Sequence, residues 1–271
     1  MKLRSNAHTH TIFCDGKNTV EEMVQAAIQR EFVSLGFSMH GYTPYEPAPI
    51  SYAREAEYRQ EVRRVREKYR GQIEILLGVE CDRLFKREYE GFEYYLDSTH
   101  WFIKDGEYVC VDYSEKRMLD WVRRLYGGDY YAYCRDYYRQ CAQVCSQSSA
   151  QFIGHIDLVT KFNEGGKYFD ETDPRYLGPA KEAIECAVRR GIPLEMNTGA
   201  ISRGYRKTPY PAPHLLKYIR ELGGEIIINS DAHSADGLET GFDACVALAV
   251  EAGFDHALRL RAAGFEEVGL E

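Results

Sequence analysis

The sequence lacks a long apolar run, and this absence excludes a membrane-spanning protein. In the 271-residue chain the longest apolar stretch, residues 244–254, is much shorter than the roughly 20 residues that a membrane span needs. The N-terminus carries neither an apolar signal segment nor a small-residue cleavage site. We therefore expect a cytoplasmic protein with no membrane partner.

The chain also lacks an excess of basic residues. It has 34 Lys and Arg against 42 Asp and Glu, and its formal net charge is −8. No basic field is therefore available to hold a long nucleic-acid backbone, and we expect no nucleic-acid partner. An anionic substrate would have to be attracted locally.

No Cys-x-x-Cys motif occurs among the eight cysteines. A chain of this size without a secretion signal is expected to keep its thiols reduced, so we predict no disulfides. Cys134, Cys141 and Cys145 fall with Tyr138 on one face of a helix, at spacings of i, i+4, i+7 and i+11. This spacing predicts a buried apolar stripe rather than a metal or redox site.

Amphipathic helices alternate with short apolar runs along the chain. Thr19 and Glu22 have capping-box spacing at the start of one helix. A second predicted helix has Pro179 at its first helical position and stops at Gly191, and a third ends at Gly223 or Gly224. Such alternation predicts an α/β fold with a parallel sheet. We find no linker or repeat and expect one domain over residues 1–271.

Seven apolar runs read as strands, and each finishes in a residue that is strongly polar or can bind a metal. The runs span residues 2–10, 32–40, 73–80, 94–101, 150–157, 192–197 and 225–233. In order, their ends carry His8 and His10, His40, Glu80, His100, His155 and Asp157, Glu195 and Asn197, and Asp231 and His233. The carboxyl ends of parallel strands meet on one face of such a fold, so these side chains are expected to share a pocket. We assign the two remaining histidines, His214 and His256, to surfaces or helix ends.

The residues at these ends predict a metal site with several ions. Together with Asp15, nine ligands are available: His8, His10, Asp15, His40, Glu80, His100, His155, Asp231 and His233. One four-coordinate ion cannot use nine ligands, whereas three divalent ions can, particularly if Glu80 bridges two of them. Three ions carry +6, and three carboxylates with one bridging hydroxide remove 4. The remaining charge of about +2 would attract a phosphate monoester dianion.

The ordered motifs resemble those of the polymerase-and-histidinol-phosphatase (PHP) superfamily, in its histidinol-phosphate phosphatase branch. They are "HTH", "DG", "SMHGY", "GVECD", "STHWF", "GHIDLVTKF", "EMNTGAISRGYRKTPYP" and "SDAHS". The resemblance implies a distorted (β/α)7 barrel, similar to a TIM barrel, with three zinc, iron or manganese ions at the carboxyl ends of the strands. It places one ion on His8, His10, Glu80 and Asp231, a second on Glu80, His100 and His155, and a third on Asp15, His40 and His233. An oxygen ligand at Asp15, where many relatives carry histidine, favours a harder ion such as Mn²⁺ or Fe²⁺.

The loop after "EMNTG" resembles the family's phosphate-binding element. Arg203 is the first candidate, because a guanidinium fork fits two phosphate oxygens. Lys161 and Arg206 are weaker candidates for substrate binding, and for Arg206 a solvated loop arginine is an equally good interpretation. We predict catalytic roles for Asp231, His233 and Arg203.

The predicted reaction is hydrolysis of L-histidinol phosphate to L-histidinol and phosphate, with a metal-bridging hydroxide as the nucleophile. Three alternatives stay open. The first is another PHP-type phosphoesterase, including one for nucleotide diesters. The second is an amidohydrolase-type enzyme, which would not need Asp15, His40 and His233 as a third site. The third is a metal-dependent regulator without turnover.

Overall fold

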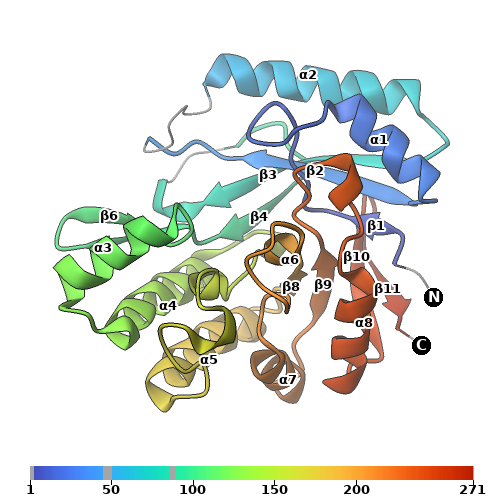
Figure 1. Cartoon of the computed structure of the whole chain (residues 1–271). Coiled ribbons are helices and arrows are strands. Elements are labelled where there is room, and N and C mark those ends of the chain that lie inside the picture. Colours follow the sequence, from blue (N-terminus) through green and yellow to red (C-terminus); the bar gives the residue numbers. More distant parts are fainter. Residues whose placement is uncertain (1–2, 45–50, 86–88, 271) are drawn as a thin grey trace.

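The computed structural model describes residues 3–44, 51–85 and 89–270, and its centre is a curved parallel sheet (Figure 1). Seven parallel strands follow each other in chain order: β1 (Ser5–Asn6), β2 (Ser34–His40), β3 (Glu74–Asp82), β4 (Tyr94–Ser98), β7 (Phe152–Ile153), β8 (Leu194–Asn197) and β9 (Ile226–Asn229). A parallel bridge between Thr9 and Ala232 joins the chain beyond β1 to the chain beyond β9. The predicted distorted (β/α)7 barrel is confirmed.

Helices lie outside the sheet, as Figure 1 shows. They are α1 (Val20–Gln29), α2 (Tyr52–Lys68), α3 (Glu115–Tyr126), α4 (Tyr130–Gln147), α5 (Pro174–Arg189), α6 (Gly199–Ser202), α7 (Pro213–Glu221) and α8 (Phe242–Glu251). Short 3₁₀ helices span Arg83–Phe85, Leu158–Thr160, Glu164–Gly166 and Ala235–Gly237. The capping box of Thr19 and Glu22 starts α1 as predicted. Among these helices none is both long and apolar enough to cross a membrane.

Two antiparallel hairpins were not predicted. One consists of β5 (Trp101–Lys104) and β6 (Glu107–Cys110), and the other of β10 (His256–Arg261) and β11 (Gly264–Gly269). Strand β10 pairs with β9, and the carbonyl of Leu260 accepts a hydrogen bond from Ser34 at the start of β2. The hairpin thus closes the barrel at the end opposite the Thr9–Ala232 bridge. One sheet therefore contains both β1 and β11. The single domain over residues 1–271 stays a prediction.

The prediction that Pro179 starts a helix is wrong. Helix α5 begins five residues earlier at Pro174, where Asp173 caps it by accepting a hydrogen bond from the backbone N–H of Arg175. Proline fits the first helical position because its missing N–H would be unpaired there anyway. Pro179 lies inside the helix. The stop at Gly191 is confirmed, because it follows the helix with a φ of +66°.

The cysteine predictions are confirmed. All eight cysteines are free. Cys134, Cys141 and Cys145 are buried on α4, together with Tyr138. They are part of the apolar layer between the helices and the sheet.

The ring of Tyr94 lies in the interior of the barrel, in an apolar cluster that also contains Leu76, Leu96, Phe152 and Leu260. Its hydroxyl lies 2.8 Å from the carbonyl oxygen of Ala7 and 3.1 Å from that of Phe37. A Cβ atom at Gly36 or Gly78 would collide with this side chain. These two glycines therefore leave the space that allows a tyrosine to lie inside the barrel below the polar strand ends.

We expect Gly78→Ala to destabilise the protein by about 1–3 kcal/mol, the usual cost of overpacking a core. Urea denaturation would measure the free energy of unfolding. Gly269→Ala in β11 is the control, because Gly269 is exposed and a Cβ there meets no atom within 4 Å. It should leave the free energy of unfolding close to the wild-type value. Equal stability of Gly78→Ala and wild type would contradict the role assigned to Tyr94.

Candidate metal centre

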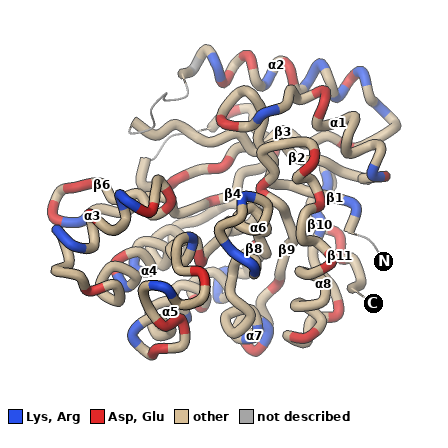
Figure 2. The backbone as a smooth tube through the Cα atoms, in the orientation of Figure 1, with Lys and Arg blue, Asp and Glu red and all other residues tan. Residues whose placement is uncertain are grey.

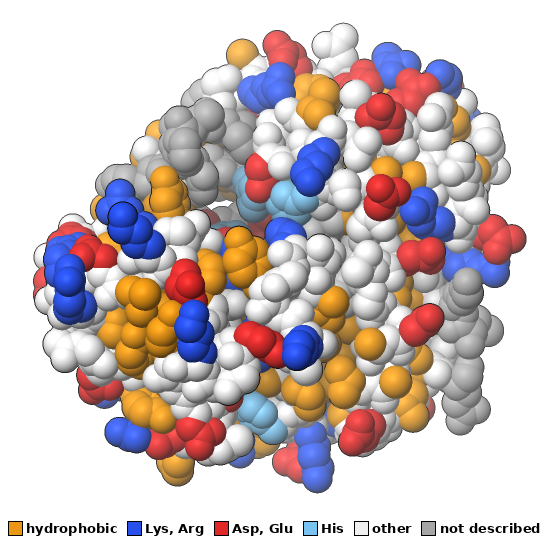
Figure 3. Space-filling model, viewed as in Figure 1, with side chains coloured by type: hydrophobic (Ala, Val, Ile, Leu, Met, Phe, Trp, Pro, Cys, Tyr) orange, Lys and Arg blue, Asp and Glu red, His pale blue; other side chains and the backbone are white. Residues whose placement is uncertain are grey.

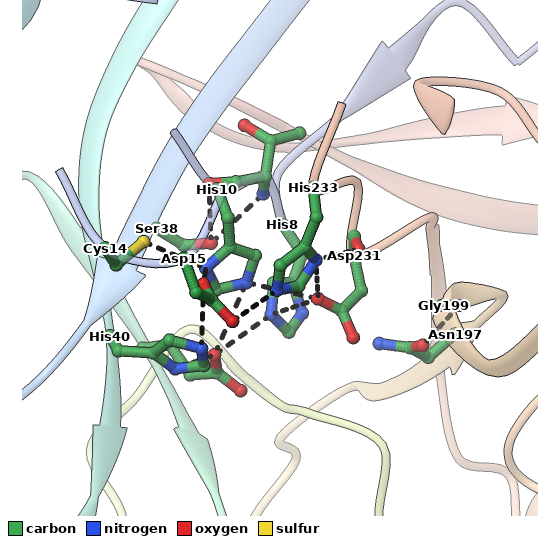
Figure 4. A network of polar contacts seen from close by, with 12 residues as sticks. His8, His10, Cys14, Asp15, Ser38, His40, Asn197, Gly199, Asp231 and His233 are labelled. Atoms are coloured by element: carbon green, nitrogen blue, oxygen red, sulfur yellow. Dashed lines mark hydrogen bonds and ion pairs between the residues drawn. The ribbon is translucent and has the colours of Figure 1, made fainter. Parts of the chain in front are cut away.

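All nine predicted ligands lie together at the carboxyl ends of the strands. Figure 4 shows part of this cluster, with His8, His10, Asp15, His40, Asp231 and His233. His8 and His10 follow β1, Asp15 lies in the loop before α1, His40 ends β2, Glu80 lies in β3, His100 follows β4, His155 follows β7, and Asp231 and His233 follow β9. The histidines appear at a hollow in the surface of the molecule in Figure 3. Six of the seven parallel strands therefore contribute to one cluster, as the sequence predicted.

Glu80 is the centre of this cluster. One carboxylate oxygen, Oε1, lies 2.9 Å from Nε2 of His155 and 3.4 Å from Nε2 of His100. The other, Oε2, lies 3.0 Å from Nδ1 of His40 and 3.3 Å from Nε2 of His8. Burial alone would raise the pKa of the Glu80 carboxyl, but the surrounding histidines outweigh it and hold that pKa well below its usual value. Its two oxygens face different histidines, as a bridging carboxylate requires.

Asp231 faces the first pair of histidines. Its Oδ1 atom lies 3.1 Å from Nε2 of His10 and 3.7 Å from Nε2 of His8. The backbone of Asp231 has a φ of +51°, a left-handed conformation that is uncommon for residues other than glycine. His233 comes two residues later, and its ring stacks on that of His10 with 4.2 Å between the centroids. The bend at Asp231 thus directs both side chains into the cluster.

A third part of the cluster is centred on Asp15. Its two carboxylate oxygens lie 3.4 Å from Nε2 of His40 and 3.0 Å from Nε2 of His233. Burial would raise the pKa of Asp15, but the histidine rings around it lower it far below its usual value. Asp15 is therefore ionised, and a carboxylate with two imidazoles forms a typical donor set for a divalent ion.

The donor atoms fit metal ions. Four buried atoms of the cluster have no hydrogen-bond partner: Nε2 of His8, Nε2 of His10, Oε2 of Glu80 and Nδ1 of His155. Buried polar atoms are rarely left unpaired in proteins, so three such atoms facing each other around Glu80 call for a ligand. Burial, together with the neighbouring His233 and His40, lowers the pKa of His10 to about 3. The neutral imidazole is the form that binds metal ions.

The nine donors form four overlapping groups, in each of which the ligand atoms lie within 4.8 Å of each other. These are His10, Asp15, His40 and His233; His8, His155 and Asp231; His8, His10 and Glu80; and His40, Glu80 and His100. The first contains all three ligands predicted for the third ion. His155 is grouped with His8 and Asp231 and also contacts Glu80, so it lies between the first two predicted ion positions.

Arg203 lies beside the cluster. Its Nη2 atom donates to Oδ2 of Asp231 at 2.9 Å, and Nη1 lies 2.9 Å from Nδ1 of His233. The Arg203 side chain remains 29 % exposed. A Cβ atom at Gly199 would come within 2.6 Å of both the Arg203 guanidinium and the Asp231 carboxylate, so glycine provides the space for this contact. Arg203 is therefore placed to contact an anion at the cluster.

A cavity of about 740 Å³ opens next to the cluster. It is lined by Asp15, His40, Glu80 and His100 on the metal side, and by Arg54, Trp101, Asp112, Tyr113 and Lys161 among others. The ammonium group of Lys161 donates to the carbonyl oxygen of Asp112 at 2.9 Å. Burial would raise the pKa of the Asp112 carboxyl, but Lys161 and His100 lower it below its usual value. The predicted role of Lys161 in substrate binding stays a prediction, and its position in this cavity supports it.

Arg206 has a different environment. Its guanidinium donates to the Glu171 carboxylate at 2.7 and 3.1 Å and to the carbonyl oxygen of Thr160 at 2.8 Å. The side chain is only 6 % exposed, so the alternative of a solvated loop arginine is wrong. Its role in substrate binding stays a prediction, but these contacts favour a structural role in which Arg206 holds the loop that presents Arg203.

We expect Arg206→Ala to lower the free energy of unfolding by about 3 kcal/mol, because it leaves Glu171 without its buried partner. Urea denaturation would measure the loss. Arg175→Ala is the matched control, since the exposed pair of Arg175 with Asp173 contributes little to stability. Unchanged stability of Arg206→Ala, combined with a large rise in KM, would instead indicate that Arg206 binds substrate.

Sequence reasoning left other polar residues of the site without a role. Glu195 was noted at a strand end but not assigned, and it lies under His8 with 2.8 Å between Oε1 and Nδ1. Asp82 accepts hydrogen bonds from the backbone N–H groups of His100 and Trp101 and so fixes the loop after β4. Glu195 lies within the predicted strand 192–197, and Asp82 lies two residues after the predicted strand 73–80. Their position is the only signal that the sequence offered.

The two histidines assigned elsewhere lie outside the cluster. His214 is the second residue of α7, and His256 starts β10, where it pairs with Asp255 and Glu225.

Lys and Arg alternate with Asp and Glu over the molecule in the view of Figure 2, as the composition suggested.

Comparisons with known proteins point to one family. The model of the PHP domain matches residues 6–199. The histidinol-phosphatase of Bacillus subtilis is 26% identical over 266 residues, which cover 89% of this chain and 97% of that protein. A probable histidinol-phosphatase of Deinococcus radiodurans is 29% identical over 256 residues, with 88% of each chain covered.

Two solved structures share the fold. Histidinol phosphate phosphatase from Lactococcus lactis, complexed with zinc, L-histidinol and phosphate, superposes with a TM-score of 0.76 at 21% identity, and the match covers 97% of this chain and 99% of that one. A protein of Listeria monocytogenes named as a putative histidinol phosphatase also gives a TM-score of 0.76, at 20% identity over 89% of this chain and 99% of that one.

Proposed function

The chain belongs to the PHP domain family, and from this premise we propose that it hydrolyses L-histidinol phosphate to L-histidinol and phosphate. The reaction takes place at a centre of three divalent ions held by the nine clustered side chains. Relatives that match 86–89% of this chain are named histidinol-phosphatase or probable histidinol-phosphatase. A structure with the same fold contains zinc, L-histidinol and phosphate.

One observation carries this proposal. The Arg203 guanidinium lies against Asp231 and His233 at the edge of the cluster, and Lys161 lines the cavity beside it. A phosphoryl group next to the nine donors would therefore have cationic groups of the protein within reach. Such an arrangement suits an anionic ester better than a neutral amide. This favours the phosphatase over the amidohydrolase alternative.

The residues of the chain have distinct tasks in this proposal. Asp231, Glu80 and Asp15 would hold the ions together with the six histidines, and zinc, iron or manganese would supply Lewis-acid activation of water and of the phosphoryl group. Arg203 would orient two non-bridging oxygens of the ester and stabilise their developing charge. Lys161 adds a point charge on the cavity wall. The cavity beyond it has room for the organic part of the substrate.

The test is phosphate release by protein reconstituted with Mn²⁺, Zn²⁺ or Fe²⁺. We expect turnover of L-histidinol phosphate that far exceeds turnover of glycerol phosphate at the same concentration. A nucleotide diester tests the phosphodiesterase alternative in the same assay. Preferential hydrolysis of the diester, or no hydrolysis of any phosphate ester by metal-loaded protein, would overturn the proposal.

A further inference from the structure

One of the seven parallel strands supplies no ligand to the cluster. Strand β8 carries Glu195, which pairs in register with Ile227 of β9, and this side chain is completely buried. It lies behind His8, on the side away from Glu80 and Asp231: Nδ1 of His8 faces Glu195, and Nε2 faces the other two acids. A buried carboxylate in this position needs an explanation, because removing a charge from water is costly.

Four N–H donors surround the Glu195 carboxylate. Oε1 accepts from Nδ1 of His8 at 2.8 Å and from Nδ2 of Asn229 at 3.0 Å. Oε2 accepts from the backbone N–H of His155 at 2.9 Å and from Nδ2 of Asn197 at 2.8 Å. The carboxylate is therefore fully hydrogen-bonded, and its partners come from the ends of β1, β7, β8 and β9. Two of these partners are predicted metal ligands.

The contact with His8 determines which ring nitrogen is available. An ionised carboxylate can only accept hydrogen bonds, so Nδ1 of His8 must carry the proton. In a neutral ring Nε2 then carries the free lone pair that a metal ion can bind. This atom is one of the buried atoms without a hydrogen-bond partner. A carboxylate behind a histidine ligand also makes the ring a stronger donor to a metal ion. His10 differs, because its Nδ1 is hydrogen-bonded to the Cys14 sulfur at 3.4 Å, and the nearest carboxylate oxygen, Oδ1 of Asp15, is farther away at 3.7 Å.

We infer that Glu195 is a positioning residue of the metal centre: it fixes the tautomer and orientation of His8, holds the backbone of His155, and thereby sets the affinity for the ions that these two histidines bind. This inference rests on the proposed metal centre. Glu195 contacts none of Asp15, His40 or His233, so its effect is confined to one part of the cluster. That selectivity separates a positioning role from a general structural one.

The experiment is a Co²⁺ titration of Glu195→Gln and wild type, followed by visible absorption and by competition with chelators of graded strength. Glutamine keeps the volume of the side chain but loses the charge and introduces N–H groups where only acceptors fit. We expect ions at the His8 and His155 positions to bind about 10–100-fold more weakly, the usual cost of losing a residue behind a metal ligand. The ion at Asp15, His40 and His233 should keep its wild-type affinity.

Two further variants make the result specific. Asp97→Asn removes another buried carboxylate, which contacts Arg83 and Ser148, and should lower thermal stability without changing any Co²⁺ affinity. Glu195→Asp keeps the charge but has a side chain that is one methylene shorter. It should weaken Co²⁺ binding at the His8 and His155 positions, but less than Glu195→Gln does. If the glutamine variant does not fold, the aspartate variant decides the question.

The outcomes separate the two proposals. Wild type with three ions and a Glu195→Gln variant with unchanged affinities would overturn the role of Glu195 and leave the proposed function intact. An equal loss of affinity for all three ions would also overturn the role of Glu195, because a general loss of structure explains that result. Wild type without any bound ion would overturn both proposals.

Discussion

Glu80→Gln is expected to abolish hydrolysis of L-histidinol phosphate, with a loss of more than about 100-fold in kcat/KM. Replacing a residue that only supports a metal ligand typically lowers metal affinity or activity about 10–100-fold. Glu80 should matter more, because its two oxygens lie within 3.4 Å of four of the six clustered histidines. The glutamine has the same shape but cannot donate two anionic oxygens to neighbouring ions. Steady-state kinetics and metal analysis of the same preparation would measure both consequences, and bound metal should fall by at least one ion per chain.

The matched control for this variant is Glu74→Gln. Glu74 begins the same strand, at the end of the barrel far from the cluster, and pairs there with Arg261. We expect it to keep wild-type kinetics and metal content. Glu80→Gln with normal turnover and three bound ions would contradict the assignment of Glu80 as the bridging ligand.

Arg203→Ala should mainly weaken substrate binding. Hydrogen bonds to charged groups contribute about 1.5–3 kcal/mol each, so the loss of one guanidinium contact corresponds to a rise in KM of about 10–100-fold. We expect a smaller decrease in kcat, because the metal ligands remain in place. Initial rates over a wide range of L-histidinol phosphate concentrations would separate the two parameters.

Lys207→Ala controls for a general loss of positive charge from the same loop, since Lys207 is exposed and four residues away. It should leave KM close to the wild-type value. An unchanged KM for Arg203→Ala would show that the guanidinium serves Asp231 alone, and that another group binds the phosphate.

The sequence predicted the cluster well because a simple geometric rule applies to parallel barrels. Residues at the carboxyl ends of parallel strands meet on one face, whatever their distance along the chain. His8 and Asp231 are 223 positions apart, yet the Thr9–Ala232 bridge brings their strands together. This rule does not apply to Asp15, which lies in a loop, but Asp15 still lies within 3.4 Å of His40 and His233.

Other features depend on contacts that a single sequence does not reveal. The burial of Arg206 depends on Glu171, which lies 35 residues earlier in a segment without a distinct motif. The β10–β11 hairpin completes the barrel only because Leu258 and Leu260 reach its interior, next to Ala7 and Tyr94. Pro179 was placed at a helix start because proline usually marks one, but the capped Pro174 had the same signal five residues earlier.

The role of Glu195 also could not be read from the sequence. An acidic residue at the end of a buried strand could be a metal ligand itself, or it could lie behind a ligand and hold it in place. The sequence fits both roles equally well. Only the position of its carboxylate, on the Nδ1 side of His8 and away from Glu80, distinguishes the two.

The most direct test of the account is the number of divalent ions that the wild-type chain retains. The protein is reconstituted with Mn²⁺ or Zn²⁺, and gel filtration removes unbound metal. Inductively coupled plasma mass spectrometry should then find about three ions per chain. The same preparation should release phosphate from L-histidinol phosphate. Protein that retains no ion after this treatment would contradict the claim that nine side chains form a metal centre.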